Sequence, residues 1–365
     1  MERSIDRRPR LSVLFILMVL PLVSCFPHNN AFDEVKWRQE VLRADPSLLY
    51  ASHFREDAFF NPWMPMEDKG FFTFLLWRFS QKGSYTDEQK AYRPKVIAGL
   101  KERILSHPGD FIVWIGHATF LIRINGEYWL TDPMFSHRAL LPARKTPPGM
   151  TLDELKSLGG KLNVVVSHNH YDHLDRSSMA ALPDDTRVFA PLGLKATIEG
   201  MNKKEVREMD WWQSLDAGNG ITLVCLPAQH WSRRVFQGRN ATLWASYLLV
   251  TPKRKIYFGG DSGYFVGYKE IGRRFPGIDY ALLPVTAYQP RWFMHYAHVD
   301  VRESIDAFRD LGARTFIPQQ WGTFPLGDEP VGYSILELNK TIKAQNLDPS
   351  KFITLDIGQI LPIGE

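Results

Sequence analysis

The stretch Ser167-His168-Asn169-His170-Tyr171-Asp172-His173 carries the strongest chemical signal in this sequence of 365 residues. It has the pattern His-x-His-x-Asp-His and directly follows an apolar run, residues 162–166, that is typical of a strand. Side chains two residues apart on an extended chain point the same way, so His168 and His170 can bind one metal ion. Asp172 and His173 lie where the chain turns and can face a second ion. The spacing therefore predicts a two-metal site at the end of a strand.

Two ions need more ligands than this stretch supplies, and strand ends elsewhere in the chain offer them. His230 follows the strand predicted at residues 221–226, and Asp261 follows the one predicted at residues 255–258. The two glycines before Asp261 allow the backbone to come close to the metals, so its carboxylate can bridge both ions. Imidazole and carboxylate ligands together suit zinc, and iron and manganese are also compatible with them.

Short apolar runs alternate with helical patterns from residue 109 onward, which predicts an α/β fold in which helices cover sheets. We expect strands at 111–115, 119–124, 128–130, 162–166, 221–226, 243–250, 255–258, 280–284, 315–318 and 352–357, with a hairpin turn at Asn125-Gly126. We expect helices at 152–158, 192–199, 301–311 and 334–344. The preceding part, from residue 25 to 108, predicts helices at 34–44 and 71–79 and is interpreted as a wrap around a catalytic domain at 109–365.

The charge of the chain gives no support to a nucleic-acid partner. The formal net charge is only +4, and four arginines against two acidic residues within residues 1–24 supply half of it. No lysine-rich run or basic helix is present that would neutralise a row of phosphates.

The amino terminus has the order of a secretory signal peptide, predicted here at residues 1–24. Arginines at positions 3 to 10 precede the apolar stretch Leu11 to Leu22, which is shorter than the roughly 20 residues that span a bilayer. The segment ends in Leu22-Val23-Ser24-Cys25, which resembles the lipobox of bacterial lipoproteins and would make Cys25 the lipidated anchor. Because Phe26 rather than an aspartate follows, we expect an outer-membrane lipoprotein that faces the periplasm.

A short membrane anchor is the alternative for this segment, and Arg7-Arg8 is a partial twin-arginine signal. The second cysteine of the chain, Cys225, lies in an apolar run and is interpreted as a buried small hydrophobic residue. If Cys25 is acylated, no intramolecular disulfide can form.

Further short motifs accompany the metal-binding stretch over much of the chain. They are Phe60–Trp63, Trp114–Thr119, Leu130–Pro133, Ser167–Asp175, Asp210–Trp212, Gln229–Trp231, Gly260–Tyr264, Tyr288–Met294, His298–Asp300 and Trp321–Phe324. With this set, residues 54–330 resemble the phospholipase D family of the metallo-β-lactamase superfamily that hydrolyses N-acylphosphatidylethanolamine. The resemblance implies a four-layer αββα sandwich, here with an N-terminal helical extension, and metals at one edge.

The resemblance also implies how the ligands divide between two zinc ions. His168, His170 and His230 would bind the first ion, Asp172 and His173 the second, and Asp261 both. The family has a histidine directly before Trp-Gly-Thr-Phe as the last ligand of the second ion, whereas this chain has Gln320 there. A glutamine amide is a weak ligand compared with imidazole, so the second site would bind its ion more weakly, take another metal or stay empty.

In the implied reaction, water activated by the metals attacks the phosphorus of a phospholipid phosphodiester. Asp172 and Asp261 would orient this water. His298 matches a family residue near the metals and is a candidate contact for the phosphate or the leaving group, the alternative being a surface histidine before a helix. Asp132 is interpreted as a partner of a ligand histidine, and His117 as structural. Residues 288–294 either line an entrance for acyl chains or pack against the N-terminal wrap.

Two other functions stay open at this point. One is a hydrolase of the same fold that cleaves a different kind of bond, as do the lactonases, thioesterases and β-lactamases that share the metal-binding stretch. The other is an envelope lipoprotein that binds metal or lipid without turnover, which the glutamine at position 320 favours. The sequence does not indicate an oligomeric state.

Overall fold

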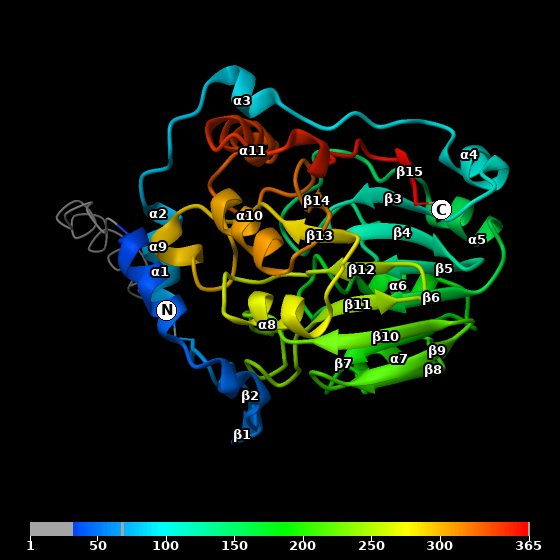
Figure 1. Cartoon of the computed structure of the whole chain (residues 1–365), viewed down its shortest axis with the longest axis horizontal. Coiled ribbons are helices and arrows are strands. Elements are labelled where there is room, and N and C mark those ends of the chain that lie inside the picture. Colours follow the sequence, from blue (N-terminus) through cyan, green and yellow to red (C-terminus); the bar gives the residue numbers. More distant parts are fainter. Residues whose placement is uncertain (1–31, 67–68, 364–365) are drawn as a thin grey trace, which may run out of the picture.

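The computed structural model describes residues 32–66 and 69–363, and two β-sheets that face each other form its centre (Figure 1). The first sheet has seven strands in the order β15-β3-β4-β5-β6-β7-β8. Its strands are β3 (Phe111–Gly116), β4 (Thr119–Ile124), β5 (Glu127–Thr131), β6 (Leu162–Val165), β7 (Arg187–Pro191), β8 (Glu205–Met209) and β15 (Ile360–Pro362). The second has six strands in the order β14-β13-β12-β11-β10-β9. Its strands are β9 (Ser214–Gly218), β10 (Ile221–Leu226), β11 (Ser246–Val250), β12 (Lys255–Phe258), β13 (Tyr280–Pro284) and β14 (Thr315–Gln319).

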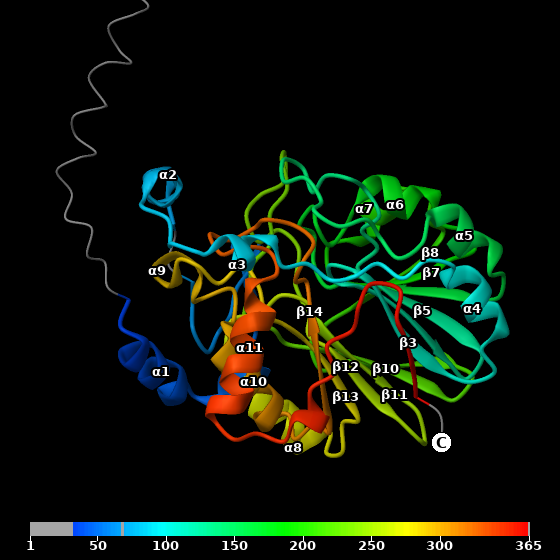
Figure 2. The same cartoon turned by 90° about the horizontal axis from the view of Figure 1, so that it is seen from above.

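Helices cover the outer face of each sheet, which completes four layers (Figure 2). The seven-stranded sheet carries α4 (Leu100–Ser106), α5 (Leu152–Ser157), α6 (Arg176–Ala181) and α7 (Lys195–Glu199), whose apolar residues share one buried cluster with its strands. The six-stranded sheet carries α8 (Gly267–Arg274), α10 (Val301–Asp310) and α11 (Tyr333–Ala344). The αββα sandwich expected from the sequence is thereby confirmed.

Strand β3 illustrates why continuous apolar runs form these sheets. Ile112 and Trp114 point into the core between the sheets, whereas Phe111, Val113 and Ile115 point outward under the covering helices. Successive side chains of a strand point to opposite faces, so a strand buried on both faces is apolar at every position. The Asn125-Gly126 turn between β4 and β5 forms as expected, with φ values of 51° and 77° that suit a tight hairpin. Cys225 is fully buried in β10, as interpreted from the sequence.

The prediction of a strand at residues 352–357 is wrong. Phe352 makes an isolated bridge to Phe316 in β14, and Ile357 makes another to Val96, so the segment crosses from the six-stranded sheet toward the seven-stranded one. It cannot form a ladder with either sheet while it crosses between them. The last strand, β15, begins only at Ile360.

The N-terminal part contains the two expected helices, α1 (Glu34–Arg43) and α2 (Phe71–Phe79), and a third, α3 (Asp87–Ala91). Between them lie the 3-10 helix Pro46–Tyr50 and a small hairpin of β1 (Phe54–Arg55) and β2 (Ala58–Phe59). The remaining short elements are α9 (Arg291–Met294) and the 3-10 helix Pro349–Lys351. Trp37, Phe59 and Trp63 belong to the main buried core, so this part packs on the sandwich as a wrap.

The expected signal peptide at 1–24 and the acylated Cys25 lie outside the described residues. Within residues 32–66 and 69–363, no helix has both the length and the apolar character needed to cross a membrane.

Candidate metal centre

The candidate metal ligands meet at one edge of the sandwich because the strands that precede them run in the same direction. In the seven-stranded sheet β3 and β6 point in one direction, since β3 is antiparallel to β4, β4 to β5, and β5 is parallel to β6. In the other sheet β10, β12 and β14 also share a direction. The metal-binding stretch follows β6, His230 follows β10 and Asp261 follows β12. Strand direction thus brings segments far apart in sequence to one place.

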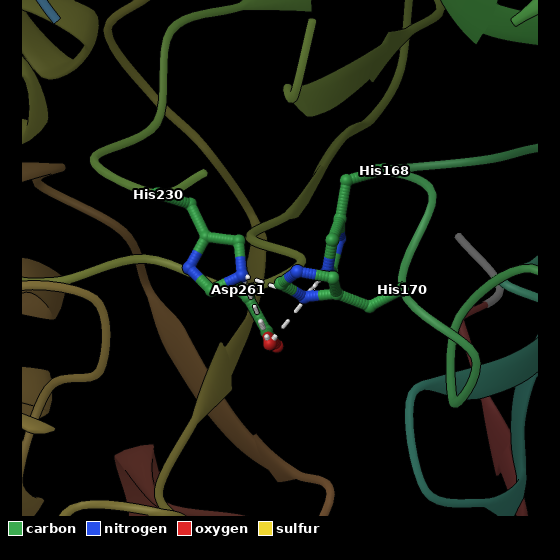
Figure 3. Close-up of side chains that lie close together, drawn as sticks. All are labelled: His168, His170, His230 and Asp261. Atoms are coloured by element: carbon green, nitrogen blue, oxygen red, sulfur yellow. Dashed lines mark hydrogen bonds and ion pairs between the residues drawn. The ribbon is translucent and has the colours of Figure 1, made fainter. Parts of the chain in front are cut away.

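A first group of four side chains surrounds a common point (Figure 3). It consists of His168, His170, His230 and Asp261, each of which offers one ligand atom within 4.8 Å of the others. His170 Nδ1 lies 2.8 Å from His168 Nε2 and 3.2 Å from His230 Nε2. Asp261 Oδ2 lies 3.8 Å and 3.6 Å from the same two nitrogens. Three imidazoles and a carboxylate in this arrangement fit a divalent metal ion such as zinc.

The protonation of these histidines suits metal binding. Burial lowers the pKa of His168 and His230 well below the usual value, and that of His170 to about 4. All three rings are therefore neutral at pH 7 and have a lone pair to offer. In His170 the nitrogen that faces the other two rings is Nδ1.

A second group lies next to the first and consists of His117, Asp172 and His173. Asp172 Oδ2 is 3.3 Å from His173 Nε2 and 3.1 Å from His117 Nε2. The carboxylate of Asp261 lies between the groups: its Oδ2 faces the first, and its Oδ1 is 3.2 Å from His173 Nε2. A carboxylate placed in this way could be shared by two ions.

Hydrogen bonds behind the two groups fix the orientation of their rings. Asp132 Oδ2 is 2.6 Å from His173 Nδ1, and Ala297 accepts from His230 Nδ1 at 3.1 Å through its carbonyl. With Nδ1 engaged, the Nε2 of each ring faces the metal position. Asp132 is thus where the sequence analysis expected it, beside a histidine of the metal-binding stretch.

Gln320 and His298 both reach this site. Gln320 is buried and donates a hydrogen bond from its amide Nε2 to Asp261 Oδ1. His298 Nδ1 lies 3.9 Å from Asp261 Oδ2, and its ring centre is 5.3 Å from that of His230. His298 therefore stands at the metal centre, partly buried, and not on the protein surface.

His117 is the residue of the site that sequence reasoning did not assign to it. It was interpreted as structural, yet the structure places it against Asp172 in the second group. The signal was present, because this histidine directly follows the apolar strand β3, much as His230 and Asp261 follow theirs. Only the direction of β3 relative to β6 turns that signal into a site.

Comparison with known proteins agrees with this fold and site. Residues 128–321 match the family described as a beta-lactamase superfamily domain. The N-acyl-phosphatidylethanolamine-hydrolyzing phospholipase D 1 of Caenorhabditis elegans is 34% identical over 277 residues, which cover 70% of this chain and 76% of the relative. The outer membrane protein RomA of Klebsiella pneumoniae is 42% identical over 106 residues, which cover 29% of this chain and 78% of RomA.

A solved metallo hydrolase from the archaeon Ignicoccus hospitalis aligns with 70% of this chain and 99% of its own, with a TM-score of 0.54 and 19% identity, and shares the fold. Fold, site and matches define a metal-dependent hydrolase of the metallo-β-lactamase superfamily. Within that superfamily, the chain belongs to the family of phospholipases D related to those that hydrolyse N-acylphosphatidylethanolamine.

Proposed function

We propose that this protein is a zinc-dependent phosphodiesterase of phospholipase D type that acts on N-acylphosphatidylethanolamine-like phospholipids. The observation that carries the proposal is the match with the C. elegans phospholipase D over 277 residues, together with two adjoining metal-ligand groups that share Asp261. Two bound ions would lower the pKa of a water molecule toward about 7 and withdraw charge from the phosphoryl oxygens.

The residues of the chain have distinct parts in this reaction. Asp172, in the second group, and Asp261, between the two groups, would orient the attacking water by accepting its hydrogens. Burial acts to raise the pKa of both, but the imidazoles around them, His173 first, hold each pKa well below its usual value. Both therefore stay ionised over the range in which His168, His170 and His230 are neutral. His298, beside Asp261, would contact the phosphate or the leaving group.

The surface beside the site supports a lipid substrate. Helix α2 has apolar side chains that are exposed, with Phe72 at 80% and Phe79 at 69%, and Trp77 of this helix stacks on Phe293 of α9 at 4.7 Å. Of residues 288–294, Phe293 packs against Trp77 of the wrap, which supports the packing interpretation for this residue, and Tyr288 is buried. The exposed apolar face of α2 is the surface that we propose meets acyl chains.

We further propose that the protein is an envelope lipoprotein anchored through Cys25, facing the periplasm from the outer membrane. The name of the RomA relative supports an envelope location. The described chain begins at Phe32, whose ring lies 4.3 Å from that of His295 directly after α9, and α9 contacts α2. An anchor seven residues earlier would thus hold the α2 side of the molecule near the membrane.

Hydrolysis of N-acylphosphatidylethanolamine by zinc-supplemented protein, residues 26–365, tests the proposed activity. We expect phosphatidic acid and N-acylethanolamine as products, and a loss of at least 100-fold in His170→Ala, because this change removes a ring from the first ligand group. His107→Ala is the matched control, since His107 follows α4 at the opposite end of β3. Absence of product from metal-loaded parent protein would reject this substrate and favour another ester or a non-catalytic role.

A further inference from the structure

We propose that His117 is the terminal nitrogen ligand of the second metal ion, and that Gln320 positions His117 and Asp261 without binding the ion. The inference rests on the two-metal centre proposed above and not on the choice of substrate. It assigns a metal-binding role to a residue that neither the spacing of the metal-binding stretch nor the resemblance assigned.

The distances around Asp172 are those of a metal site. With metal–ligand bonds of about 2.0–2.1 Å, the donor atoms of a tetrahedral zinc site lie about 3.3–3.4 Å apart. In the second group the His117 Nε2 to Asp172 Oδ2 distance is 3.1 Å, and that from Asp172 Oδ2 to His173 Nε2 is 3.3 Å. His173 Nε2 lies 3.2 Å from Asp261 Oδ1, which supplies the bridge.

With His117 included, the two proposed metal sites have the same number of protein donor atoms. The first ion would have three terminal imidazoles and the Asp261 carboxylate. With His117, the second would have two imidazoles, the carboxylate of Asp172 and the same bridge, which again makes four. Without His117 the second ion would keep three protein donors, one fewer than the first.

The ring of His117 lies in the second group, with its Nε2 directed at the carboxylate of Asp172. It is fully buried, and among the described residues its Nδ1 has no hydrogen-bond partner. Its Nε2, 3.1 Å from Asp172 Oδ2, is therefore the ring nitrogen placed to bind an ion beside that carboxylate.

The backbone of His117 is held on three sides, which fixes the direction of its ring. Its N–H donates to Thr323 Oγ1 at 2.9 Å. Its carbonyl accepts from Trp114 Nε1 at 2.7 Å and from the backbone N–H of Gln320 at 3.0 Å. With φ of 54°, His117 lies in the left-handed region, a strained conformation that is common at functional sites.

Gln320 is oriented for a different task. Its amide Nε2 donates to Asp261 Oδ1, and the nitrogen of an amide has no lone pair to give to a metal. Its backbone supports the carbonyl of His117. Gln320 is therefore a positioning residue that links the loop after β14 to both the bridge and His117.

The test measures metal content and ligand identity in the full-length protein. Zinc per chain is determined by mass spectrometry at limited free zinc for the parent, His117→Ala and Gln320→Ala. We expect about two ions in the parent, about one in His117→Ala and about two in Gln320→Ala. Retention of two ions in His117→Ala, or loss of one in Gln320→Ala, would overturn the proposal, as would a parent that binds a single ion.

A direct readout separates a ligand from a residue that only supports Asp172. In the cobalt-loaded His117→Cys variant we expect a near-ultraviolet thiolate-to-cobalt charge-transfer absorption, whereas Gln320→Cys should show none. The parent, with Cys25 and Cys225, gives the baseline. If His117→Ala fails to fold, His117→Cys still tests the proposal. A folded His117→Cys variant without the absorption would show that residue 117 does not bind the ion and only supports Asp172. A parent protein that binds two ions but has no phosphodiesterase activity would reject the proposed substrate and leave this inference standing.

Discussion

At the scale of single residues, Asp132 organises the metal-binding stretch. Its Oδ1 accepts from the backbone N–H of Ser167 at 2.6 Å, and its Oδ2 accepts from the Ser167 hydroxyl at the same distance. The same oxygen holds His173 Nδ1 at 2.6 Å. One fully buried carboxylate thus sets both the start of the loop and the ring of its last ligand.

Replacement of this carboxylate by an amide tests its effect on metal binding. In Asp132→Asn we expect the affinity for the second ion to fall by roughly 10–100-fold, because His173 loses its charged partner. The first ion should stay bound, since its ligands do not contact Asp132. Competition with a chelator measures both affinities.

Asp153→Asn is the control for this experiment. Asp153 lies in α5 with its side chain 90% exposed, so its loss should change neither affinity. An unchanged second-ion affinity in Asp132→Asn would show that Asp132 does not orient the ligand.

At the scale of elements, α2 is an apolar helix with exposed aromatic side chains. Its sequence, Phe-Phe-Thr-Phe-Leu-Leu-Trp-Arg-Phe, has a single charged residue, and Phe72, Phe74, Leu76 and Phe79 are all exposed. Trp77 fixes the helix to the body by stacking on Phe293 and donating to Asp328 Oδ1 at 3.1 Å. Exposed apolar groups of this kind are characteristic of a surface that meets a membrane.

Two changes test membrane attachment. We expect Cys25→Ser to release most of the protein from the membrane fraction, because it removes the proposed lipid anchor. In the released protein, Phe72→Ser with Phe79→Ser should weaken binding to phospholipid vesicles about 10-fold or more, since each change removes an exposed apolar ring. Sedimentation with vesicles measures this binding.

Leu105→Ser and Val96→Ser provide a matched pair of controls. Both residues are exposed but lie outside α2, and they should leave vesicle binding unchanged. Full membrane attachment of Cys25→Ser would contradict the lipid anchor, and equal vesicle binding of the α2 variant would contradict the membrane-facing role of α2.

At the scale of the whole molecule, Arg291 connects the N-terminal wrap to the sandwich and to the site. Its Nε donates to Glu34 Oε1 of α1 at 3.0 Å, and its Nη2 lies 2.8 Å from Glu303 Oε1 of α10. Its Nη1 donates to the carbonyl of His298 at 3.2 Å. A single buried guanidinium therefore holds three segments together.

Removing this guanidinium should destabilise the fold strongly. We expect Arg291→Ala to lower the free energy of unfolding by about 3–5 kcal/mol, because Glu303 would remain buried without its cation. Urea denaturation at pH 7 measures the change. Arg309→Ala, which removes an exposed pair with Asp306 within α10, should cost less than about 1 kcal/mol. Equal costs for the two variants would show that Arg291 does not connect these segments.

Local pattern alone predicted much of the sandwich and most of the candidate site. Buried strands such as β3, β4 and β10 read as apolar runs, because burial on both faces leaves no position for a polar side chain. The metal-binding stretch predicted His168, His170, Asp172 and His173 together, because its spacing is set within one loop. His230 and Asp261 were added because they follow predicted strands and because the metal-binding stretch requires further ligands.

Tertiary packing decided what depends on contacts between distant segments. His117 is separated from Asp172 by 55 residues, so only the directions of their strands reveal that they meet. The resemblance placed Gln320 at the site, but only the structure shows that its amide donates to Asp261. The apolar pattern of residues 352–357 predicts a strand and does not indicate that this segment crosses between the two sheets. Short-range spacing encodes strands and the ligands within one loop, whereas the order and direction of strands determine which loops share a metal centre.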